Sequence, residues 1–336
     1  MDSLSQALLG ATTFALVKDK EIGKKSLLIG AIAGTIPDLD VFLSPLFNDV
    51  AFLSVHRSVS HSVVLALVLS LILGAIFHRI YKKEQSQIKW MFAFFLSIMT
   101  HSILDWFTTY GTKLLSPFSS HLFSTNNIHV IEPIYTMILL IGVVVLLIKN
   151  STSSGRKRVL NLTIVISTLY MSWTFVSKGI ANHHFVKALQ RENIDYEKLM
   201  VTPTPLNSIL WHGIAKTSEG YYLGTYSLFD HREHIVFYYE ESAHELTEEL
   251  REHKLVKYYL EYTQDFPLIK QDENGNVKIY AIKYGPVNYT GQPEFVYPLT
   301  FNLNTLQDSA VEIDYSGEQR GPVKNYKDLY ERIKGV

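Results

Sequence analysis

The sequence predicts an α-helical polytopic membrane domain of about six helices, followed by a soluble α+β domain. Four long apolar runs lie within the first 180 residues, more than soluble helical bundles tolerate. Charged residues, tyrosines and turn residues are mixed through the remainder. Short segments rich in aromatic and β-branched residues, typical of strands, occur in that second part. We therefore expect domains at residues 1–180 and 181–336.

The membrane domain is predicted from the length and polarity of its apolar runs. Residues 62–77 carry no charge, and with their flanks they reach roughly the 20 residues that a spanning helix needs. Three runs of similar length follow it, at residues 90–109, 131–148 and 159–177. Two weaker candidates precede it, at residues 3–17 and 26–43. The last of these is interrupted by Pro37 and two aspartates. Buried helices of a soluble protein are the alternative interpretation.

Lysine and arginine concentrate in alternate connecting loops of the predicted bundle. These loops are residues 18–25, 79–89 and 149–158, whereas residues 44–61 and 109–130 contain only Arg57 and Lys113. Because cytoplasmic loops retain positive charge, six crossings place the N-terminus and everything after about residue 179 outside. We expect a multi-pass protein of a bacterial cytoplasmic (inner) membrane with its C-terminal domain on the outer side.

Composition excludes some classes of function. The net charge of −1 gives no basic surface for nucleic acid, so no nucleic-acid partner is expected. The chain contains no cysteine. Disulfides, thiolate metal sites and cysteine nucleophiles are therefore excluded.

Histidines and carboxylates from separate segments are predicted to meet at the outer ends of the spans. Asp38 and Asp40 end the second apolar segment, while His101 and Asp105 are spaced i, i+4 and so share one helix face. The candidate metal ligands are Asp38, Asp40, His56, His61, His101 and Asp105, with Asp2, His121, His129 and Glu132 as possible additions. Each pair alone could be a salt bridge or a helix-end polar residue. Together they indicate function, because ionisable groups at membrane depth are costly.

A bound divalent cation would relieve the repulsion between several clustered carboxylates. Nitrogen and oxygen ligands without sulfur suit Zn²⁺ in a catalytic role, with Mn²⁺ or Fe²⁺ as alternatives, and one to three ions are expected. Such ions acidify water and polarise a phosphoryl oxygen. Asp40 is the candidate general base, and Arg57 could pair with phosphate oxygens or extend to the headgroup level.

The order of four motifs resembles a known family. "MDSLSQALLGA", "IPDLD", "HRSVSHS" and "HSILDWFTTYG" together are similar to the membrane-bound metal-dependent hydrolases, also described as LexA-binding, inner membrane-associated hydrolases. The resemblance covers roughly residues 1–150. It implies a distant relation to zinc-dependent phospholipase C and single-strand nucleases, and hence a helical scaffold with a multinuclear metal site.

The same resemblance assigns some ligands and leaves one position open. A histidine followed four residues later by an acid is a recurrent ligand pair there, which His101 and Asp105 match; His129 and Glu132 are spaced by three. Many relatives have histidine where this chain has Gln6. The sequence thus implies either the loss of one ligand, which would lower metal number or affinity, or a contact from Asp2.

The C-terminal domain is predicted from alternation and turn signals. Strands are expected at 220–230, 234–240, 276–285 and 294–303, a proline-stiffened entry strand at 201–213, and a helix at 242–264.

Three functions follow from these observations. The first is a membrane-embedded, phospholipase C-like or phosphatase-like metal-dependent hydrolase. It would cleave a phosphoester of a lipid or lipid-linked substrate at the outer face, so membrane lipids are its expected partners. The second is a membrane transporter or metal carrier, because intramembrane carboxylates and histidines also build ion pathways. The third is a scaffold in which the polar cluster only stabilises the helices.

Overall fold

The computed structural model describes residues 1–81, 86–150, 154–231, 234–296, 298–303, 311–314 and 323–335. They form two compact units. The first contains residues 1–43, 55–125 and 130–174, and the second contains residues 44–54, 126–129 and 175–336. Lys82 and Lys83 of the predicted basic loops lie outside the described residues.

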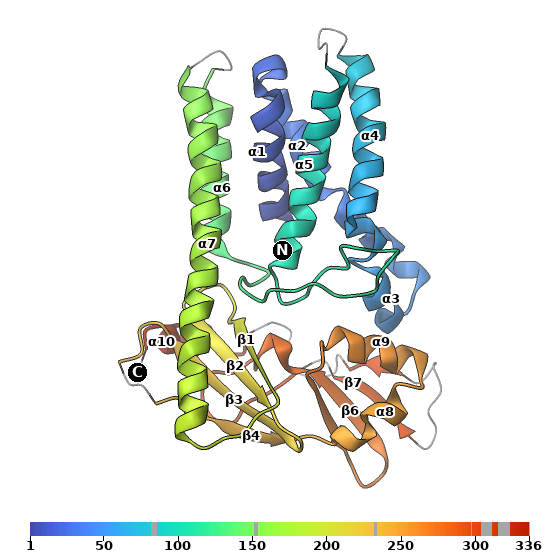
Figure 1. Cartoon of the computed structure of the whole chain (residues 1–336), viewed down its shortest axis with the longest axis vertical. Coiled ribbons are helices and arrows are strands. Elements are labelled where there is room, and N and C mark those ends of the chain that lie inside the picture. The colour runs from blue at the N-terminus through green and yellow to red at the C-terminus, as the bar shows by residue number, and fades with distance from the viewer. Residues whose placement is uncertain are drawn as a thin grey trace. The chain divides into compact units, whose positions relative to one another are not determined.

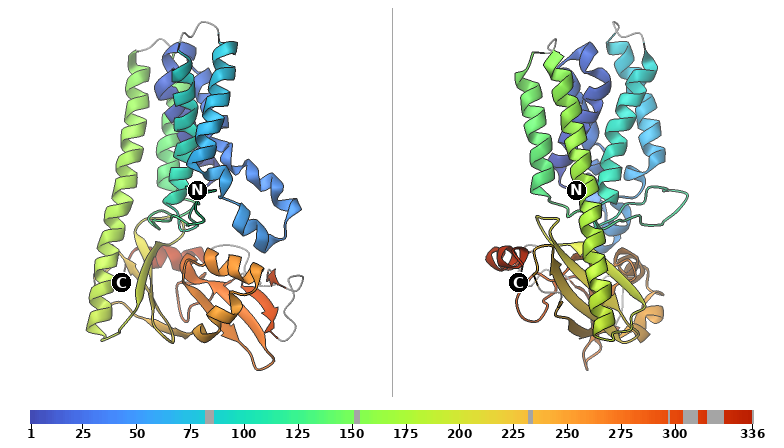
Figure 2. Two further views of the ribbon diagram at one scale, coloured as in Figure 1. Left: turned by 45° about the vertical axis from the view of Figure 1, so that its right-hand side comes forward. Right: turned by 60° about the vertical axis from the view of Figure 1, so that its left-hand side comes forward.

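The first unit is a helical bundle (Figure 1). Its helices and 3₁₀ segments are α1 (Ser3–Ile22), α2 (Lys25–Thr35), η1 (Pro37–Leu46), η2 (Val59–His61), α4 (Val63–Ile80), α5 (Gln87–Trp106), α6 (Pro133–Ile148) and the first part of α7 (Ser154–Arg191). Within this unit the helices run alternately up and down, so the last turns of α1, α4 and α6 and the first turns of α2, α5 and α7 lie at one end (Figures 1 and 2). These helix ends flank the connections predicted to be cytoplasmic.

Fewer of these helices qualify as membrane spans than the six expected. Among the described residues, α4 and the Gly155–Arg191 part of α7 are long and apolar enough to cross a membrane. A third span is counted if α2 and η1, bent by 40° relative to one another, are taken together. Helix α6 is apolar but has only 16 residues. Helices α1 and α5 are more polar because they carry buried hydroxyl, amide and ionisable side chains toward their neighbours.

Close backbone contact holds the first unit together where it carries the site. A Cβ atom on Gly10 would lie 2.6 Å from the carbonyl oxygen of Gly30, so only glycine permits α1 and α2 to approach this closely. The Ser97 hydroxyl of α5 donates to the carbonyls of both Gly10 and Gly30, at 3.1 and 2.9 Å. Phe14 and Trp90 belong to the apolar core beside this contact. Helix α5 is thereby fixed against α1 and α2.

The second unit contains two antiparallel sheets of four strands each. The first has the order β1 (Lys198–Pro203), β2 (Leu210–Lys216), β3 (Gly220–Ser227) and β4 (Tyr238–Glu241); the second has β5 (Pro267–Gln271), β6 (Asn276–Ala281), β7 (Leu299–Asn302) and β8 (Glu312–Ile313). Its short helical segments are α3 (Asp49–Val55, of which Val55 belongs to the first unit), η3 (His244–Leu246), α8 (Thr247–Leu250), α9 (Lys254–Tyr262), η4 (Ile282–Tyr284) and α10 (Tyr326–Ile333). An α+β fold with antiparallel sheets is therefore confirmed.

Two predicted elements of this unit were wrong in detail. Residues 201–213 are not one strand, because the chain turns between β1 and β2 at Leu206, whose φ is 66°, and Asn207. The Asn207 side chain accepts hydrogen bonds from the backbone of Ile209 and Leu210, which closes this turn. The predicted helix 242–264 is divided into η3, α8 and α9.

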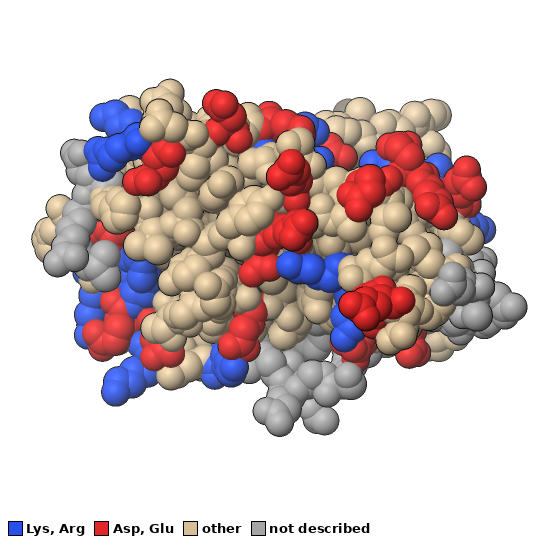
Figure 3. Space-filling view, turned by 90° about the horizontal axis from the view of Figure 1, so that it is seen from below, with Lys and Arg blue, Asp and Glu red and all other residues tan. Residues whose placement is uncertain are grey.

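Residues of α7 from Phe175 onward pack within the second unit. Phe185 and Ala188 share a buried cluster with Trp211 and Tyr226 of the first sheet. The Trp211 indole N–H donates to the Ser177 hydroxyl at 2.9 Å. The face of this unit seen in Figure 3 carries interspersed acidic and basic side chains, as expected for a surface in water.

Candidate metal centre

The site is built from the ends of helical segments in the first unit. Pro37 ends the run of α2 and begins η1, which presents Asp38 and Asp40 on its inner side. His61 is the last residue of η2, one residue before Ser62, which caps α4. His101 and Asp105 lie one turn apart on the last turns of α5, as their spacing predicted.

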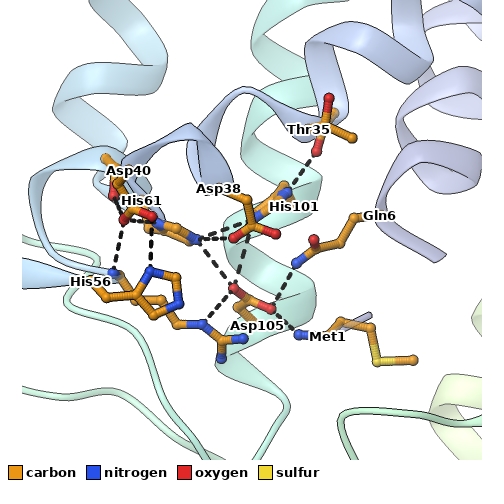
Figure 4. A network of polar contacts seen from close by, with 12 residues as sticks. Met1, Gln6, Thr35, Asp38, Asp40, His56, His61, His101 and Asp105 are labelled. Carbon is orange, nitrogen blue, oxygen red and sulfur yellow. Dashed lines mark hydrogen bonds and ion pairs between the residues drawn. The ribbon is translucent and has the colours of Figure 1, made fainter. Parts of the chain in front are cut away.

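Asp38, His61, His101 and Asp105 converge on one point (Figure 4). The His61 Nε2 atom lies 3.1 Å from His101 Nε2, 3.3 Å from Asp38 Oδ1 and 3.3 Å from Asp105 Oδ2. His101 Nε2 lies 3.4 Å from Asp38 Oδ1 and 3.7 Å from Asp105 Oδ2. His61, His101 and Asp105 are fully or almost fully buried.

These donor distances fit a tetrahedral metal site. Zinc binds histidine nitrogen and carboxylate oxygen at about 2.0–2.2 Å, so neighbouring ligand atoms around a tetrahedral ion are about 3.3–3.6 Å apart. Asp38 Oδ1 and Asp105 Oδ2 are buried and make no well-formed hydrogen bond within the described chain, although Arg57 Nε lies 3.2 Å from Asp105 Oδ2. An orphaned carboxylate oxygen is costly unless a cation satisfies it. The donor set therefore fits a divalent ion.

The histidine rings are oriented for this role by their other nitrogens. His101 Nδ1 lies 2.6 Å from the Gly34 carbonyl oxygen, which directs Nε2 toward the carboxylates. The Ser60 hydroxyl lies 2.8 Å from His61 Nδ1. Such partners fix the tautomer and the ring orientation of metal-binding histidines.

A second group shares Asp38 with the first. Asp38, Asp40 and His56 offer ligand atoms that all lie within 4.8 Å of one another. His56 Nδ1 is 2.8 Å from Asp40 Oδ1, and the Ser60 hydroxyl donates to Asp40 Oδ2 at 2.5 Å. A carboxylate that belongs to two ligand groups, as Asp38 does, can bridge two metal ions.

Asp105 is held by donors on both of its oxygens. The Gln6 side-chain amide donates to Oδ1 at 2.9 Å, and the amino group of Met1 contacts the same oxygen. Arg57 Nε lies 3.2 Å from Oδ2. Its backbone N–H also donates to Asp40 Oδ2, at 3.2 Å, so Arg57 contacts one carboxylate of each group.

Arg57 is more buried than a headgroup-level arginine would be. It is 6% exposed, and its guanidinium carbon lies 4.3 Å over the ring of Tyr110. Burial raises the pKa of Tyr110 to about 12, so its ring remains neutral beside the guanidinium. Arg57 has a φ of 58°, a conformation that non-glycine residues rarely adopt and that is typical of functional sites.

The pocket favours positive charge. Burial lowers the pKa of His61, but hydrogen-bonding contacts with Asp105 and Asp38 outweigh it and raise that pKa above its ordinary value. The carboxylates thus stabilise a proton on the imidazole in the place where they would stabilise a metal ion.

The structure separates the predicted residues into two sets. The six principal candidates lie together in the two groups. Neither group includes Asp2, His121, His129 or Glu132. Asp2 instead caps α1 by accepting from the Ser5 backbone N–H at 2.8 Å. Glu132 is buried and accepts from the Tyr170 hydroxyl at 2.6 Å.

Sequence reasoning missed the supporting residues. The Gln6 side-chain amide donates to Asp105, and Asp2 caps α1 and belongs to neither group, so the contact expected from Asp2 is not seen. Ser60 was visible in the motif "HRSVSHS", where a hydroxyl precedes His61. The contact between His101 and the Gly34 carbonyl could not be predicted, because a backbone oxygen is present at every residue and leaves no signal in the sequence.

The helical unit, its apolar spans and this buried polar centre define an integral membrane protein with a candidate metal site. A family model described as YdjM inner membrane protein matches residues 1–181. Because the match covers more than half of the chain, the protein belongs to the YdjM inner membrane protein family. No curated protein and no solved structure matches the chain. The family assignment supports an inner-membrane location.

Proposed function

We propose that this protein is a membrane-embedded metal-dependent hydrolase that cleaves a phosphoester of a lipid or lipid-linked substrate at the outer face of the membrane. The observation that carries the proposal is the convergence of four donor atoms near the spacing of a tetrahedral ion, two of them the buried carboxylate oxygens Asp38 Oδ1 and Asp105 Oδ2. The resemblance to metal-dependent hydrolases supports the same reaction class.

The proposed ligands of the first ion are Asp38, His61, His101 and Asp105, and Asp38, Asp40 and His56 would hold a second. We propose Zn²⁺, with Mn²⁺ or Fe²⁺ as alternatives. When bound, such ions supply Lewis acidity that acidifies water and polarises a phosphoryl oxygen.

The side chains around the two groups have separate proposed roles. Asp40 accepts a hydrogen bond from the Ser60 hydroxyl and lies against His56, so with the second ion absent this pair could take up and pass on a proton as general base. Arg57 positions Asp40 and Asp105 together, and its cation offsets negative charge that develops on a phosphoryl group.

We further propose a multi-pass topology with the C-terminal unit outside. The alternating helix directions place the Lys- and Arg-bearing connections at the end of the bundle opposite to the site (Figure 1). The positive-inside rule then assigns the site to the outer leaflet.

The proposal is tested by metal content and turnover of the full chain purified in detergent. We expect Zn²⁺ or another transition metal at one to two ions per chain by mass spectrometry, and hydrolysis of phosphatidylcholine or p-nitrophenyl phosphate by the metal-loaded protein. His101→Ala should abolish both. His121→Ala is the matched control, because the exposed His121 belongs to neither group.

Absence of transition metal from the wild-type chain, or equal metal content in His101→Ala, would overturn the proposal. Bound metal without hydrolysis of either ester would leave a metal-binding scaffold. A different alternative, the scaffold in which the polar cluster only stabilises the helices, is favoured by one observation: Asp105 already has the cationic partners Arg57 and Met1, which could neutralise it without an ion.

A further inference from the structure

The segments that carry the site have an apolar outer side. In η1, Asp40 is 7% exposed, while Phe42, two residues further on, is 75% exposed. In the loop after α5, Phe118 is 84% exposed. We define the apolar rim as six exposed apolar residues of η1, η2 and the loop after α5: Leu39, Val41, Phe42, Val59, Leu115 and Phe118.

Backbone and hydroxyl contacts join the rim segments around the metal centre. The Lys113 N–H donates to the Arg57 carbonyl at 3.0 Å, and the Ser58 and Ser116 hydroxyls lie 3.3 Å apart. Arg57 in turn donates to Asp40 of η1. The rim therefore belongs to the same part of the first unit as the ligands.

The rim lies at the level where α4 begins. The Val63 N–H, in the first turn of α4, donates to the Leu114 carbonyl at 3.0 Å. From there α4 exposes a continuous apolar face that includes Leu67 and Leu71. Because α4 is long and apolar enough to cross a membrane, this face contacts hydrocarbon, and the rim extends it at one end.

Aromatic side chains mark the same level. The rings of Trp106 and Phe123 lie 6.3 Å apart at the end of α5 and in the following loop. Tryptophan and tyrosine are enriched where hydrocarbon meets the lipid headgroups. Trp106, at the end of α5, therefore supports an interfacial position for the rim.

We propose that the apolar rim inserts into the outer interfacial layer of the bilayer and receives the hydrocarbon chain of the substrate. Insertion places the metal centre at headgroup depth, so a phosphoester attached to a long hydrocarbon chain reaches it laterally. The substrate class rests on the proposed function, whereas the insertion of the rim stands on the exposure and contacts of these residues.

The chain has no cysteine, so single-cysteine variants can carry a nitroxide label without background. Phe42→Cys and Phe118→Cys test the rim in vesicles of phosphatidylcholine and phosphatidylglycerol. Leu71→Cys, on the exposed face of α4, is the lipid control, and Lys198→Cys, on β1, is the aqueous control. Electron paramagnetic resonance measures collisions with oxygen, which concentrates in hydrocarbon, and with a water-soluble nickel chelate.

We expect oxygen-to-nickel accessibility ratios at 42 and 118 close to that at 71. If the oxygen-to-nickel accessibility ratios at positions 42 and 118 equal the ratio at position 198, the rim does not insert into the bilayer and the proposal is overturned. Labels protected from both reagents would overturn it as well, because they would show the rim covered by protein.

Turnover separates the substrate class from the insertion. Phe42→Ser and Phe118→Ser should lower hydrolysis of long-chain phosphatidylcholine by about tenfold, the loss expected from one apolar side chain, and leave p-nitrophenyl phosphate hydrolysis unchanged. Equal losses on both esters would overturn chain recognition by the rim. If the wild-type chain hydrolyses neither ester, the proposed function fails, while the accessibility ratios still decide the insertion.

Discussion

Asp105 shows how a buried carboxylate is kept in a single orientation. Its Oδ1 accepts from Gln6, and its Oδ2 faces Arg57, His61 and His101. The amide at Gln6 is 1% exposed, so it has no competing water. Oδ1 thereby binds protein donors alone, whereas Oδ2 faces the two histidines of the first group together with Arg57.

Gln6→Ala should weaken metal binding by about 10- to 100-fold without removing a ligand, because an orienting partner of the carboxylate is lost. Titration of the metal-depleted full chain with Zn²⁺ measures this. Gln87→Ala, an exposed glutamine at the start of α5, should bind as the wild type does. Unchanged affinity in Gln6→Ala would contradict the orienting role.

A second buried residue predicts a pH dependence. His212 on β2 is 2% exposed, and burial lowers its pKa to about 4, an effect that the Gly224 backbone opposes only in part. Between about pH 6.5 and 4 the unfolded chain binds a proton there and the folded chain does not. The free energy of unfolding should therefore fall by up to roughly 3 kcal/mol as the pH drops through this range.

Urea unfolding followed by tryptophan fluorescence at pH 7.5 and 5 measures this loss, because Trp211 is buried beside His212. His212→Phe should remove most of the pH dependence. His234→Phe, at a 61% exposed side chain, should retain it. If the free energy of unfolding depends on pH equally in His212→Phe and His234→Phe, the dependence arises from groups other than His212.

Single residues of the site could be predicted where residue type and spacing carry the signal. The i, i+4 pair His101 and Asp105 placed two ligands on one face, and Asp38 could be added because a charged residue at membrane depth needs a partner. Gln6 and Ser60 could be interpreted only with coordinates, because amides and hydroxyls are common in helices and their partners lie far away in sequence.

At the scale of elements, close packing of α1, α2 and α5 sets the ligand positions. Gly10 and Gly30 let two backbones touch, and Ser97 bonds to both carbonyls. His101, one turn further along α5, is fixed with them. The apolar runs predicted α1 and α5 to within a few residues, whereas the run 26–43 is divided into α2 and η1. They did not predict that α1 and α5 bury polar faces against each other.

Gly10→Ala should destabilise the protein by about 1–3 kcal/mol, because its Cβ would lie 2.6–2.7 Å from backbone atoms of α2. Thermal unfolding in detergent measures the loss. Gly179→Ala is the matched control: nothing lies within 4 Å of its Cβ, so the change should be neutral or stabilising by up to about 1 kcal/mol. Equal melting temperatures for the two variants would contradict the contact.

Strands of the second unit were harder to predict than helices. Alternation located β3, β6 and parts of β4 and β7, but β5 was not predicted, since its five residues PLIKQ carry no clear period. The β1–β2 turn was missed because Pro203 and Pro205 indicated one stiff segment. Short strands depend on cross-strand partners, which a single chain segment does not reveal.

At the scale of the whole molecule, the two units expose different surfaces. Helices α4 and α6 expose leucine, isoleucine and valine along their length, whereas the second unit exposes charged side chains (Figure 3). Composition alone predicted this division of the chain.

Orientation can be tested on the intact cell with the cysteine-free chain. A membrane-impermeant maleimide should label Lys198→Cys in whole spheroplasts, because the C-terminal unit is proposed to lie outside. Lys20→Cys, in the basic segment near the end of α1, should react only after lysis. The reverse labelling pattern would contradict the proposed topology, and labelling of both sites in whole spheroplasts would contradict it too.

The spacing of the four donor atoms has a consequence for the choice of ion. The two histidine Nε2 atoms lie 3.1 Å apart and 3.3–3.7 Å from the two carboxylate oxygens, which suits a small fourfold shell, and the anchoring of α5 by Ser97 opposes its expansion. Magnesium demands six oxygen neighbours and gives up its hydration water reluctantly. A stiff cage of two imidazoles and two carboxylates therefore discriminates by coordination number, so that abundant alkaline-earth ions would not displace a scarce transition metal.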